Sequence, residues 1–281
     1  MRNVAVHRYT RNPGDMLAAD ALLLETVLAQ ARRHPSRLAF LFRAAKGHAL
    51  FLAAAAPSSP ALLRSLRLAA DACAASFRLA GRPEERAVVV RLEDEEVVLD
   101  GFNAPGPHAS DWMDGFLSAC AARDTHAMPW LCAVRNDEMI HAGVEFDPGV
   151  FDYIDGLRLL RGDPAAAKAA FARALTTNAL GEIHIADRQY VADLFLPMIE
   201  LGLRLVEGEP RAFNDTLEHA LLRHRAYWSH HEERREDPTG FFALGPTAMA
   251  CLATDRGIAL DVESPYMPSL LVTPGASTTH R

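Results

Sequence analysis

The feature that most constrains how this chain folds is a sequence segment that occurs twice, here called the doubled phrase. "LRLLRGDPAAAKAAFARAL" begins at Leu157, and a similar stretch, "LRLVEGEPRAFNDTLEHAL", begins at Leu203. With Tyr153 aligned to Ile199, the identical positions are Gly156/Gly202, Leu157/Leu203, Arg158/Arg204, Leu159/Leu205, Gly162/Gly208, Pro164/Pro210, Ala166/Ala212, Ala174/Ala220 and Leu175/Leu221. These matches fall where helices end and begin.

Gly162 and Gly208 suit the left-handed conformation that ends a helix. Pro164 and Pro210 suit the first turn of the next helix, where a missing N–H breaks no hydrogen bond. Each stretch is therefore predicted to be helix, tight turn, helix. Helix pairs that recur about every 40 to 47 residues are typical of α-solenoid arrays, in which one pair buries its apolar face against the next. Two copies predict a helical-repeat lobe inside a compact domain; the alternative, that two unrelated helix hairpins share Gly, Pro and Leu here, stays open.

The spacing of apolar residues predicts further helices on both sides of the doubled phrase. In the N-terminal half they cover about 13–33 and 36–55, and two more begin at Pro60 and near Ser110. In the C-terminal half they cover the segment from Val191 to Leu205 and about 241–256, and Gly257 ends the last helix. The predicted N-caps are Asp15, Ser59, Ser110 and Asp187, and Pro197 predicts a kink. One apolar helix face is made by Phe213, Leu217, Ala220, Leu221, His224 and Trp228.

The segment "RAVVVRLEDEEVVLDGF" changes to the pattern of strands. Two β-branched runs, 88–92 and 97–99, flank an acidic turn at 93–96, which predicts a β-hairpin. The predicted fold is mostly α: a helical array of stacked antiparallel helix pairs, repeat-like in the C-terminal half, with one small hairpin. We expect a single domain over 1–272, divided into N-terminal helices and hairpin (1–147) and a repeat-like lobe (148–272), and a flexible tail over 273–281.

Composition excludes some classes of partner. The 281 residues are 49% hydrophobic and 23% charged, an ordinary globular balance, with a formal net charge of −7. An acidic chain is unsuited to gripping nucleic acid, because that binding relies on clustered Lys and Arg. The stretch "RAAKGHALFLAAAA" is apolar, but Arg43, Lys46 and His48 interrupt it and argue against a membrane span. The start of the chain lacks the apolar region of a secretory signal, so we expect a cytoplasmic protein.

Cysteine and histidine patterns predict no metal site or disulfide. Cys73, Cys120, Cys132 and Cys251 are scattered without a C-x-x-C pair and are interpreted as small core residues. A histidine-rich segment contains His219, His224, His230 and His231, but residues at i and i+5 point about 140° apart on a helix. Zinc ligands need closer convergence, so we interpret the 230–233 region as a solvated charged loop. His184, Asp187 and Arg188 lie together in "GEIHIADRQY", where a helix cap by Asp187 is favoured over an acid/base cluster.

Catalytic motifs are missing from the sequence. It has no G-x-G-x-x-G after a strand, no phosphate-binding G-x-x-x-x-G-K-[ST], no H-E-x-x-H and no G-x-S-x-G. We therefore predict no catalytic residue, no cofactor and no small-molecule substrate. An enzyme whose site is assembled from distant residues remains an alternative, and it would show perturbed titrating groups in one deep cleft.

The hairpin carries the most concentrated charge. Its acidic residues are Glu93, Asp94, Glu95, Glu96 and Asp100. They are either a solvated turn or an anionic surface that steers a basic protein partner, an effect that raises the association rate more than the affinity.

The C-terminal third resembles a known family. "FNDTLEHALLRHRAYW" is followed by an Ala/Leu-rich helix that leads to Asp-Arg-Gly, and then by a closing Ser-Pro-Tyr-Met-Pro segment. Together these features resemble the immunity 49 family of bacterial polymorphic-toxin systems, most specifically over 212–272, with a weaker likeness at "FNAPGPHASDWMDGFLSAC". The resemblance implies a largely helical protein that binds and neutralises a cognate secreted toxin.

On this hypothesis the partner is the toxin domain, blocked sterically, and the acidic residues of the hairpin are the predicted contacts. Trp112, Trp130, Tyr227 and Trp228 are candidate anchors, although each also suits a buried core position. The alternatives are a helical-repeat adaptor that binds another protein and an enzyme that reverses the toxin's modification.

Overall fold

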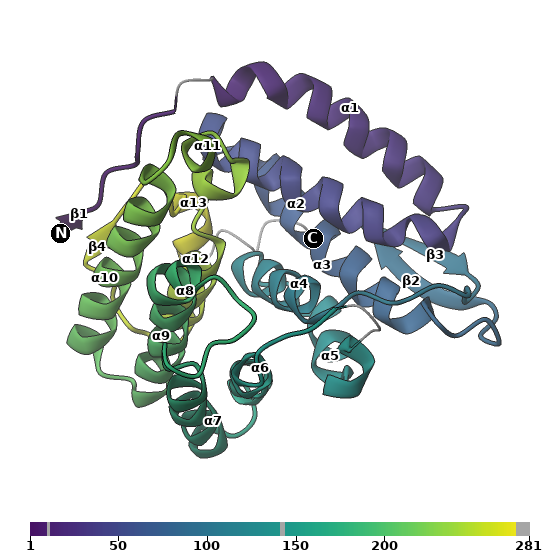
Figure 1. Ribbon diagram of the computed structural model, residues 1–281. Coiled ribbons are helices and arrows are strands. Elements are labelled where there is room, and N and C mark those ends of the chain that lie inside the picture. The colour runs from purple at the N-terminus through teal and green to yellow at the C-terminus, as the bar shows by residue number, and fades with distance from the viewer. Residues whose placement is uncertain (10–11, 141–143, 274–281) are drawn as a thin grey trace. The chain divides into compact units, whose positions relative to one another are not determined.

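The computed structural model describes residues 1–9, 12–140 and 144–273 and is 65% helical. Two compact units form, and each is described by itself (Figure 1): an N-terminal unit, 12–140, and a C-terminal unit, which combines 1–9 with 145–273. The mostly α fold with one small antiparallel hairpin is confirmed. The single-domain assignment stays a prediction, and the tail predicted from 273 lies, beyond Thr273, outside the described residues.

In the N-terminal unit α3 is the central helix. The unit begins with α1 (Pro13–Ala31), the short turn η1 (Pro35–Arg37), α2 (Leu38–Ala55) and α3 (Pro60–Leu79). The hairpin of β2 (Val88–Leu92) and β3 (Glu95–Leu99) follows, and then α4 (Ala109–Ala121), α5 (Ala127–Ala133) and η2 (Asn136–Met139). Because α3 packs against α2, α4, α5 and β2, it lies at the centre of the unit's core.

Helix α2 is a buried core helix of this unit. Among the described residues, Pro35–Ala55 is the one helical segment whose length and mean hydropathy of 1.3 would suit a membrane span, and 50% of that window is buried. Two of the three polar residues of α2 are paired within the unit, since Lys46 Nζ lies 2.6 Å from Asp114 and His48 Nδ1 lies 2.8 Å from Asp20, and the third, Arg43, is exposed. Buried helices commonly meet the same criteria, so the segment is weak evidence for a span, and the absence of a membrane stays a prediction.

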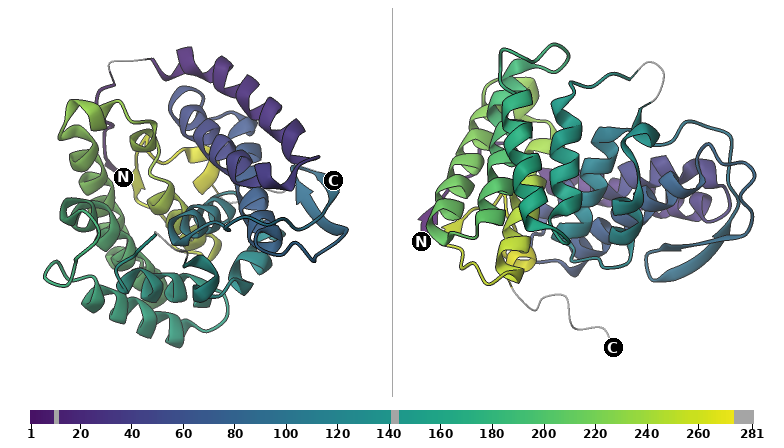
Figure 2. Two further views of the ribbon diagram at one scale, coloured as in Figure 1. Left: turned by 45° about the vertical axis from the view of Figure 1, so that its right-hand side comes forward. Right: turned by 90° about the horizontal axis from the view of Figure 1, so that it is seen from below.

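The C-terminal unit contains the two helix pairs of the doubled phrase. The first pair is α6 (Gly149–Leu159) with α7 (Pro164–Thr177), and the second is α9 (Leu196–Glu207) with α10 (Pro210–Ser229). Between them lie α8 (Arg188–Tyr190) and η3 (Val191–Phe195), and α10 is followed by α11 (Glu232–Arg235), η4 (Pro238–Phe241), α12 (Leu244–Asp255), β4 (Val262–Glu263) and α13 (Ser269–Val272). Helix α7 packs on both α6 and α9, so the two pairs lie side by side (Figure 2).

One aromatic ring joins the two pairs. The fully buried Phe171 of α7 lies against Gly156 of α6 and Gly202 of α9, which are matched positions of the doubled phrase. A Cβ added at either glycine would stand 2.6 Å from Phe171 Cε1, far inside van der Waals contact. The matched glycines therefore let two helices approach the same ring. Whether the pairs are copies of one repeat stays a prediction.

A single arginine binds the C-terminal end of the first helix in each pair. Arg256, which follows α12, donates to the carbonyl oxygens of Leu160 (2.5 Å) and Leu205 (3.2 Å). These carbonyls lie at the C-terminal ends of α6 and α9, where the last C=O groups have no partner within the helix and carry the negative end of its dipole. Asp-Arg-Gly is thus a structural motif: the arginine caps two helices, and Gly257, with φ of 80°, ends α12.

The N-terminal segment is bound to the C-terminal end of the same unit. β1 (Arg2–Asn3) pairs in parallel with β4, and Ser264 Oγ donates to Val4 O (2.7 Å). The Tyr266 hydroxyl accepts from the His7 backbone N–H (2.7 Å) and lies 2.5 Å from His7 Nδ1. The Ser-Pro-Tyr segment therefore positions residues from the opposite end of the chain, a small parallel pairing that was not predicted.

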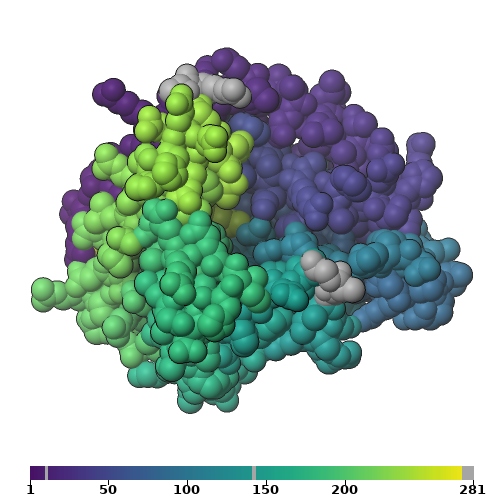
Figure 3. Space-filling model, in the orientation of Figure 1, coloured from purple at the N-terminus to yellow at the C-terminus, as the bar shows by residue number. Residues whose placement is uncertain are grey.

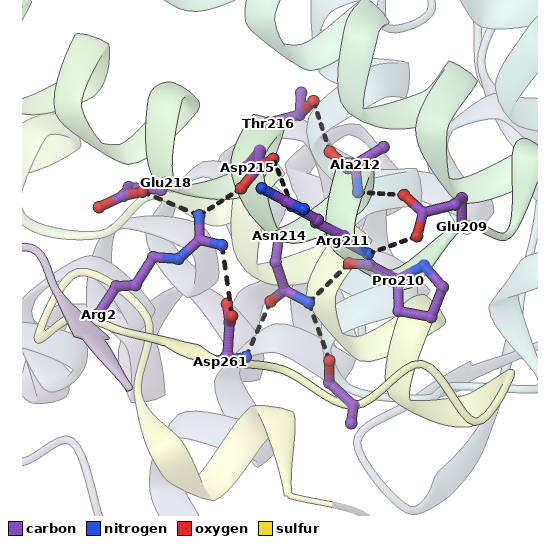
Figure 4. Close-up of polar contacts among 11 residues, drawn as sticks. Arg2, Glu209, Pro210, Arg211, Ala212, Asn214, Asp215, Thr216, Glu218 and Asp261 are labelled. Atoms are coloured by element: carbon purple, nitrogen blue, oxygen red, sulfur yellow. Dashed lines mark hydrogen bonds and ion pairs between the residues drawn. The ribbon is translucent and has the colours of Figure 1, made fainter.

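Arg2 and Asn214 hold this segment to α10 (Figure 4). Arg2 forms ion pairs with Asp215 (2.6 Å), Glu218 (3.0 Å) and Asp261 (3.4 Å). The buried Asn214 donates to Pro210 O and Ala259 O and accepts from Asp261 N, at 2.8–2.9 Å. Each polar group of the Asn214 amide is thus used to fasten the 259–261 segment onto the helix.

Several helix boundaries follow the sequence. Ser59 and Asp187 cap their helices as predicted, Pro60, Pro164 and Pro210 lie in first turns, and Gly208 has the left-handed φ of 71°. The predicted face of α10 is buried throughout, from Phe213 to Trp228.

Other boundary predictions were wrong. Asn12, not Asp15, caps α1, since its side chain accepts from Gly14 N–H. The residue that precedes α4 is His108, so Ser110 lies inside the first turn. Gly162 does not adopt the left-handed conformation; the loop closes through hydrogen bonds from Gly162 N and Asp163 N to Leu159 O.

Two local features take a form that periodicity alone did not give. The hairpin turn is shorter than the predicted 93–96 segment, because Leu92 pairs with Glu95 and only Glu93, at φ of 60°, and Asp94 lie between the strands. The distortion expected at Pro197 appears as a turn of π-helix, Val191–Phe195, just before it. Proline supplies no N–H to the preceding turn, which favours such a widened hydrogen-bond pattern.

Candidate functional site

The predicted acidic site lies on the hairpin of the N-terminal unit. Figure 3 shows the segment that includes it uncovered at the right-hand edge of the view. Two of its carboxylates, Glu93 and Glu95, share Arg32 at the end of α1, with distances of 3.3 and 2.9 Å. Asp100 accepts from the Ala87 N–H (2.9 Å) at the base of the hairpin. Glu93 and Asp100 therefore help to fix the hairpin's conformation.

Arginines near the turn reduce its net negative charge. Arg64 and Arg67 of α3 line a depression together with Glu93, Asp94 and Glu95. Among the described residues, Asp94 and Glu96 form no ion pair. The acidic character of the hairpin thus rests on Asp94, Glu96 and the exposed Glu95.

Glu96 forms no ion pair with its cross-strand neighbour, because that neighbour binds elsewhere. Arg91 lies opposite Glu96 in the strand register, and such a pair would ordinarily interact. Instead Arg91 Nε lies 3.0 Å from Asp71 Oδ2, and Arg91 Nη2 pairs with Asp124. Both acids are buried, and Arg91 joins them to β2. Glu96 is left facing solvent without a counter-ion.

This buried cluster is the strongest candidate for the titrating site that an enzyme would need. Burial raises the pKa of Asp71 to about 7, against the opposing hydrogen bond from Arg91. Asp124 also accepts from the backbone N–H groups of His126 (2.7 Å) and Ala127 (3.1 Å), which start α5. Its carboxylate oxygens are therefore committed to holding β2 and α5 on α3. The cluster thus helps to hold the hairpin on its unit, and both of its carboxylates are buried.

The outer face of the hairpin is apolar at its centre. Val89 and Val98 are directly opposite in the register, and their side chains are 48% and 61% exposed. We call Val89, Asp94, Glu95, Glu96 and Val98 the hairpin surface. An apolar centre beside charged residues is the usual anatomy of a protein-binding surface.

A groove lies beside the hairpin in the same unit. Its volume is about 350 Å³, and it is lined by Phe77, Arg78, Arg82, Glu85, Val88, Trp130, Ala133, Val134, Arg135 and Glu138. Trp130 of α5 is 43% exposed, and the Arg78 guanidinium stacks on its ring at 3.8 Å. Trp130 was a predicted candidate anchor, whereas the groove has no signal in the sequence, because its walls come from α3, β2 and the segment around α5.

The other three candidate anchors are core residues. Trp112 is fully buried, with its indole N–H donating to Leu131 O (2.8 Å), and Tyr227 and Trp228 are each 8% exposed. Of the four, only Trp130 can offer a substantial surface to a partner.

The cysteines pack in or near the core, and the histidine-rich segment is mostly exposed. Cys73, Cys120 and Cys251 are buried and Cys132 is half-buried, and none of them forms a disulfide. Among the described residues, no group of three or more His, Cys, Asp or Glu could hold a metal ion. His219, His230 and His231 are exposed, whereas His224 is buried and donates from Nε2 to Gly240 O (3.1 Å). Residues 232–235 form the short α11 rather than a loop.

The comparisons with known proteins supply the family. A family model described as "Immunity protein 49" matches residues 53–271. The chain belongs to the immunity protein 49 family. In the comparisons with curated proteins and with solved structures, nothing matches. The predicted resemblance is therefore confirmed, and membership supports an immunity role with a protein partner.

In this member of the immunity protein 49 family, the motifs that carried the resemblance build the fold. Arg256 caps α6 and α9, and Tyr266 binds the N-terminal segment. The immunity protein's exposed candidate contact features, the hairpin surface and the Trp130 groove, lie in the other unit. The motifs that identify the family and the candidate contact residues are thus different sets.

Proposed function

We propose that this immunity protein neutralises a cognate bacterial toxin by binding it directly, in the cytoplasm of the producing cell, and by covering the toxin's active site. Family membership supports the immunity role. The contact is proposed to include the hairpin surface, and the observation that carries this is the exposed Val89/Val98 pair beside Asp94, Glu95 and Glu96.

The two parts of the hairpin surface have different roles in this proposal. Exposed carboxylates speed the approach of a basic toxin, because charge at the rim of an interface acts chiefly on the association rate. The valine pair is desolvated on contact and slows dissociation. A standard interface buries about 1,600 Å², so neighbouring surfaces of the N-terminal unit also take part.

The first test is a pull-down of the tagged chain from its source bacterium under toxin-expressing conditions, followed by mass spectrometry. A single stoichiometric partner whose toxicity is suppressed by co-expression of this chain supports the proposal. Several unrelated partners would favour an adaptor, and suppression without a stable complex would favour an enzyme.

The contact itself is tested by charge reversal. Asp94→Lys with Glu96→Lys should slow association with the captured toxin by roughly tenfold at low salt, with a smaller effect at high salt. Glu25→Lys with Glu233→Lys, which reverses two exposed charges on α1 and α11, is the matched control. Equal association rates for the two variants would remove the hairpin from the proposed contact.

A further inference from the structure

One arginine of the Trp130 groove forms no ion pair within the described residues. Of its arginines, Arg82 pairs with Glu138 (2.5 Å) and Arg135 with Asp137 (3.0 Å). No carboxylate of the described residues lies within ion-pairing distance of the third, Arg78. Burial lowers the pKa of Arg78, which reflects a partly desolvated guanidinium. Glu85, which also lines the groove, acts on Arg78 electrostatically and opposes this effect of burial without forming an ion pair. A partly desolvated cation without an ion pair favours an anionic ligand.

The position of Arg78 is fixed by two contacts. One face of its guanidinium lies 3.8 Å from the Trp130 ring centroid, and Arg78 Nη1 donates to Val89 O (2.9 Å). Stacking and a backbone hydrogen bond hold the planar group in one orientation and so reduce the entropy lost when a ligand binds. A guanidinium has further N–H donors in a fixed plane, and that plane matches a carboxylate.

The groove also suits a protein segment in size and in lining. A volume of about 350 Å³ can hold one or two side chains with their backbone, since pockets for small ligands begin at about 300 Å³. Exposed tryptophan and arginine are the residue types that most often dominate binding energy in protein interfaces. Val88 of β2 lines the groove and its neighbour Val89 belongs to the hairpin surface, so the two features are continuous.

We propose that this groove receives a carboxylate-bearing segment of the toxin, with the carboxylate on Arg78 and the adjoining apolar part of the segment against Trp130. The inference rests on the proposed function, and it adds a second contact of opposite charge to the acidic hairpin. A partner that must present both a basic patch to the hairpin and a carboxylate to the groove, at a fixed separation, is recognised more selectively than one that presents a single charge.

Two groove variants test this contact, each by calorimetric titration with the toxin domain recovered in the pull-down. Trp130→Ala and Arg78→Gln should each raise the dissociation constant by about 10- to 100-fold. Arg43→Gln removes an equal charge from an exposed position of α2 and should leave the affinity within about twofold. Thermal melts establish that each variant is folded; if Arg78→Gln loosens the hairpin, Trp130→Ala carries the test, because that side chain is already 43% exposed.

Fluorescence quenching gives a readout that does not depend on affinity. Iodide reaches exposed indoles, and Trp112 and Trp228 are buried. Quenching of the free protein's fluorescence should therefore come mainly from Trp130, which a Trp130→Phe variant would verify. Formation of the complex should protect Trp130 from iodide.

The possible failures are distinguishable. If wild-type protein binds the toxin while both groove variants bind equally well and Trp130 stays open to iodide, the groove proposal is overturned and the proposed function stands. If the wild-type protein binds no toxin, the proposed function fails and the groove contact fails with it.

Discussion

Arg256 acts at the scale of a single residue on two helices at once. Its guanidinium reaches carbonyl oxygens at the ends of α6 and α9. Hydrogen bonds that involve a charged group contribute about 1.5–3 kcal/mol each when buried. Arg256→Gln is therefore expected to lower the free energy of unfolding by about 2–4 kcal/mol, measured by urea denaturation. Arg211→Gln is the control, since the Arg211 side chain is 87% exposed; a similar loss in both variants would refute the capping role.

His224 makes the stability of the C-terminal unit depend on pH. Burial lowers the pKa of His224 to about 4, while the unfolded chain has a value near 6.5, so the unfolded state takes up the proton first. Stability is therefore lost as the pH falls from about 6.5 toward 4, by up to about 3 kcal/mol.

His224→Gln should flatten this dependence, because glutamine does not titrate and can still donate to Gly240 O. Urea unfolding at pH 7 and pH 4.5 measures the difference. If the variant and the wild type lose equal stability on acidification, another group is responsible.

At the scale of elements, the matched glycines set how closely the helix pairs pack. Gly156→Ala and Gly202→Ala each place a methyl group 2.6 Å from Phe171 Cε1, and overpacking of this kind costs about 1–3 kcal/mol. Both variants should melt at lower temperature than the wild type. Gly162→Ala is the matched control, because a Cβ there meets nothing within 4 Å, and it should be neutral or slightly stabilising. Tolerance of alanine at both helical glycines would contradict the packing role of Phe171.

At the scale of the whole molecule, the N-terminal segment belongs to the C-terminal unit. Residues 1–9 contribute β1 and the His7 contact with Tyr266 to that unit, although the N-terminal unit separates them along the chain. Deletion of residues 1–9 should therefore loosen α10 and the 258–266 segment while α2 and α3 stay unchanged. Hydrogen–deuterium exchange read by mass spectrometry resolves these segments, and equal protection of α10 with and without residues 1–9 would contradict the assignment.

The candidate contact surfaces lie in one unit, and the repeated helix pairs lie in the other. The doubled phrase predicted a helical-repeat lobe in the C-terminal half, whereas the hairpin surface lies on β2 and β3 and the Trp130 groove is built on α3, β2 and the segment around α5.

Local chemistry in the sequence determined where most helices and the hairpin form. Apolar residues at helical spacing, prolines in first turns and Gly208 after α9 act within a few residues of one another, so their effects can be read along the chain. The hairpin strands were found for the same reason. The misplaced caps, at Asp15 and Ser110, are errors of a few residues between competing polar side chains.

Only the tertiary structure decided which side chains are available to a partner. Arg91 could have neutralised Glu96, but Asp71 and Asp124, from distant parts of the chain, bind it instead. Trp130 is exposed and Trp112 is buried, although both are tryptophans on neighbouring helices of the same unit. Charge compensation and burial depend on what long-range packing brings within a few ångströms, and no local pattern in the sequence contains that information.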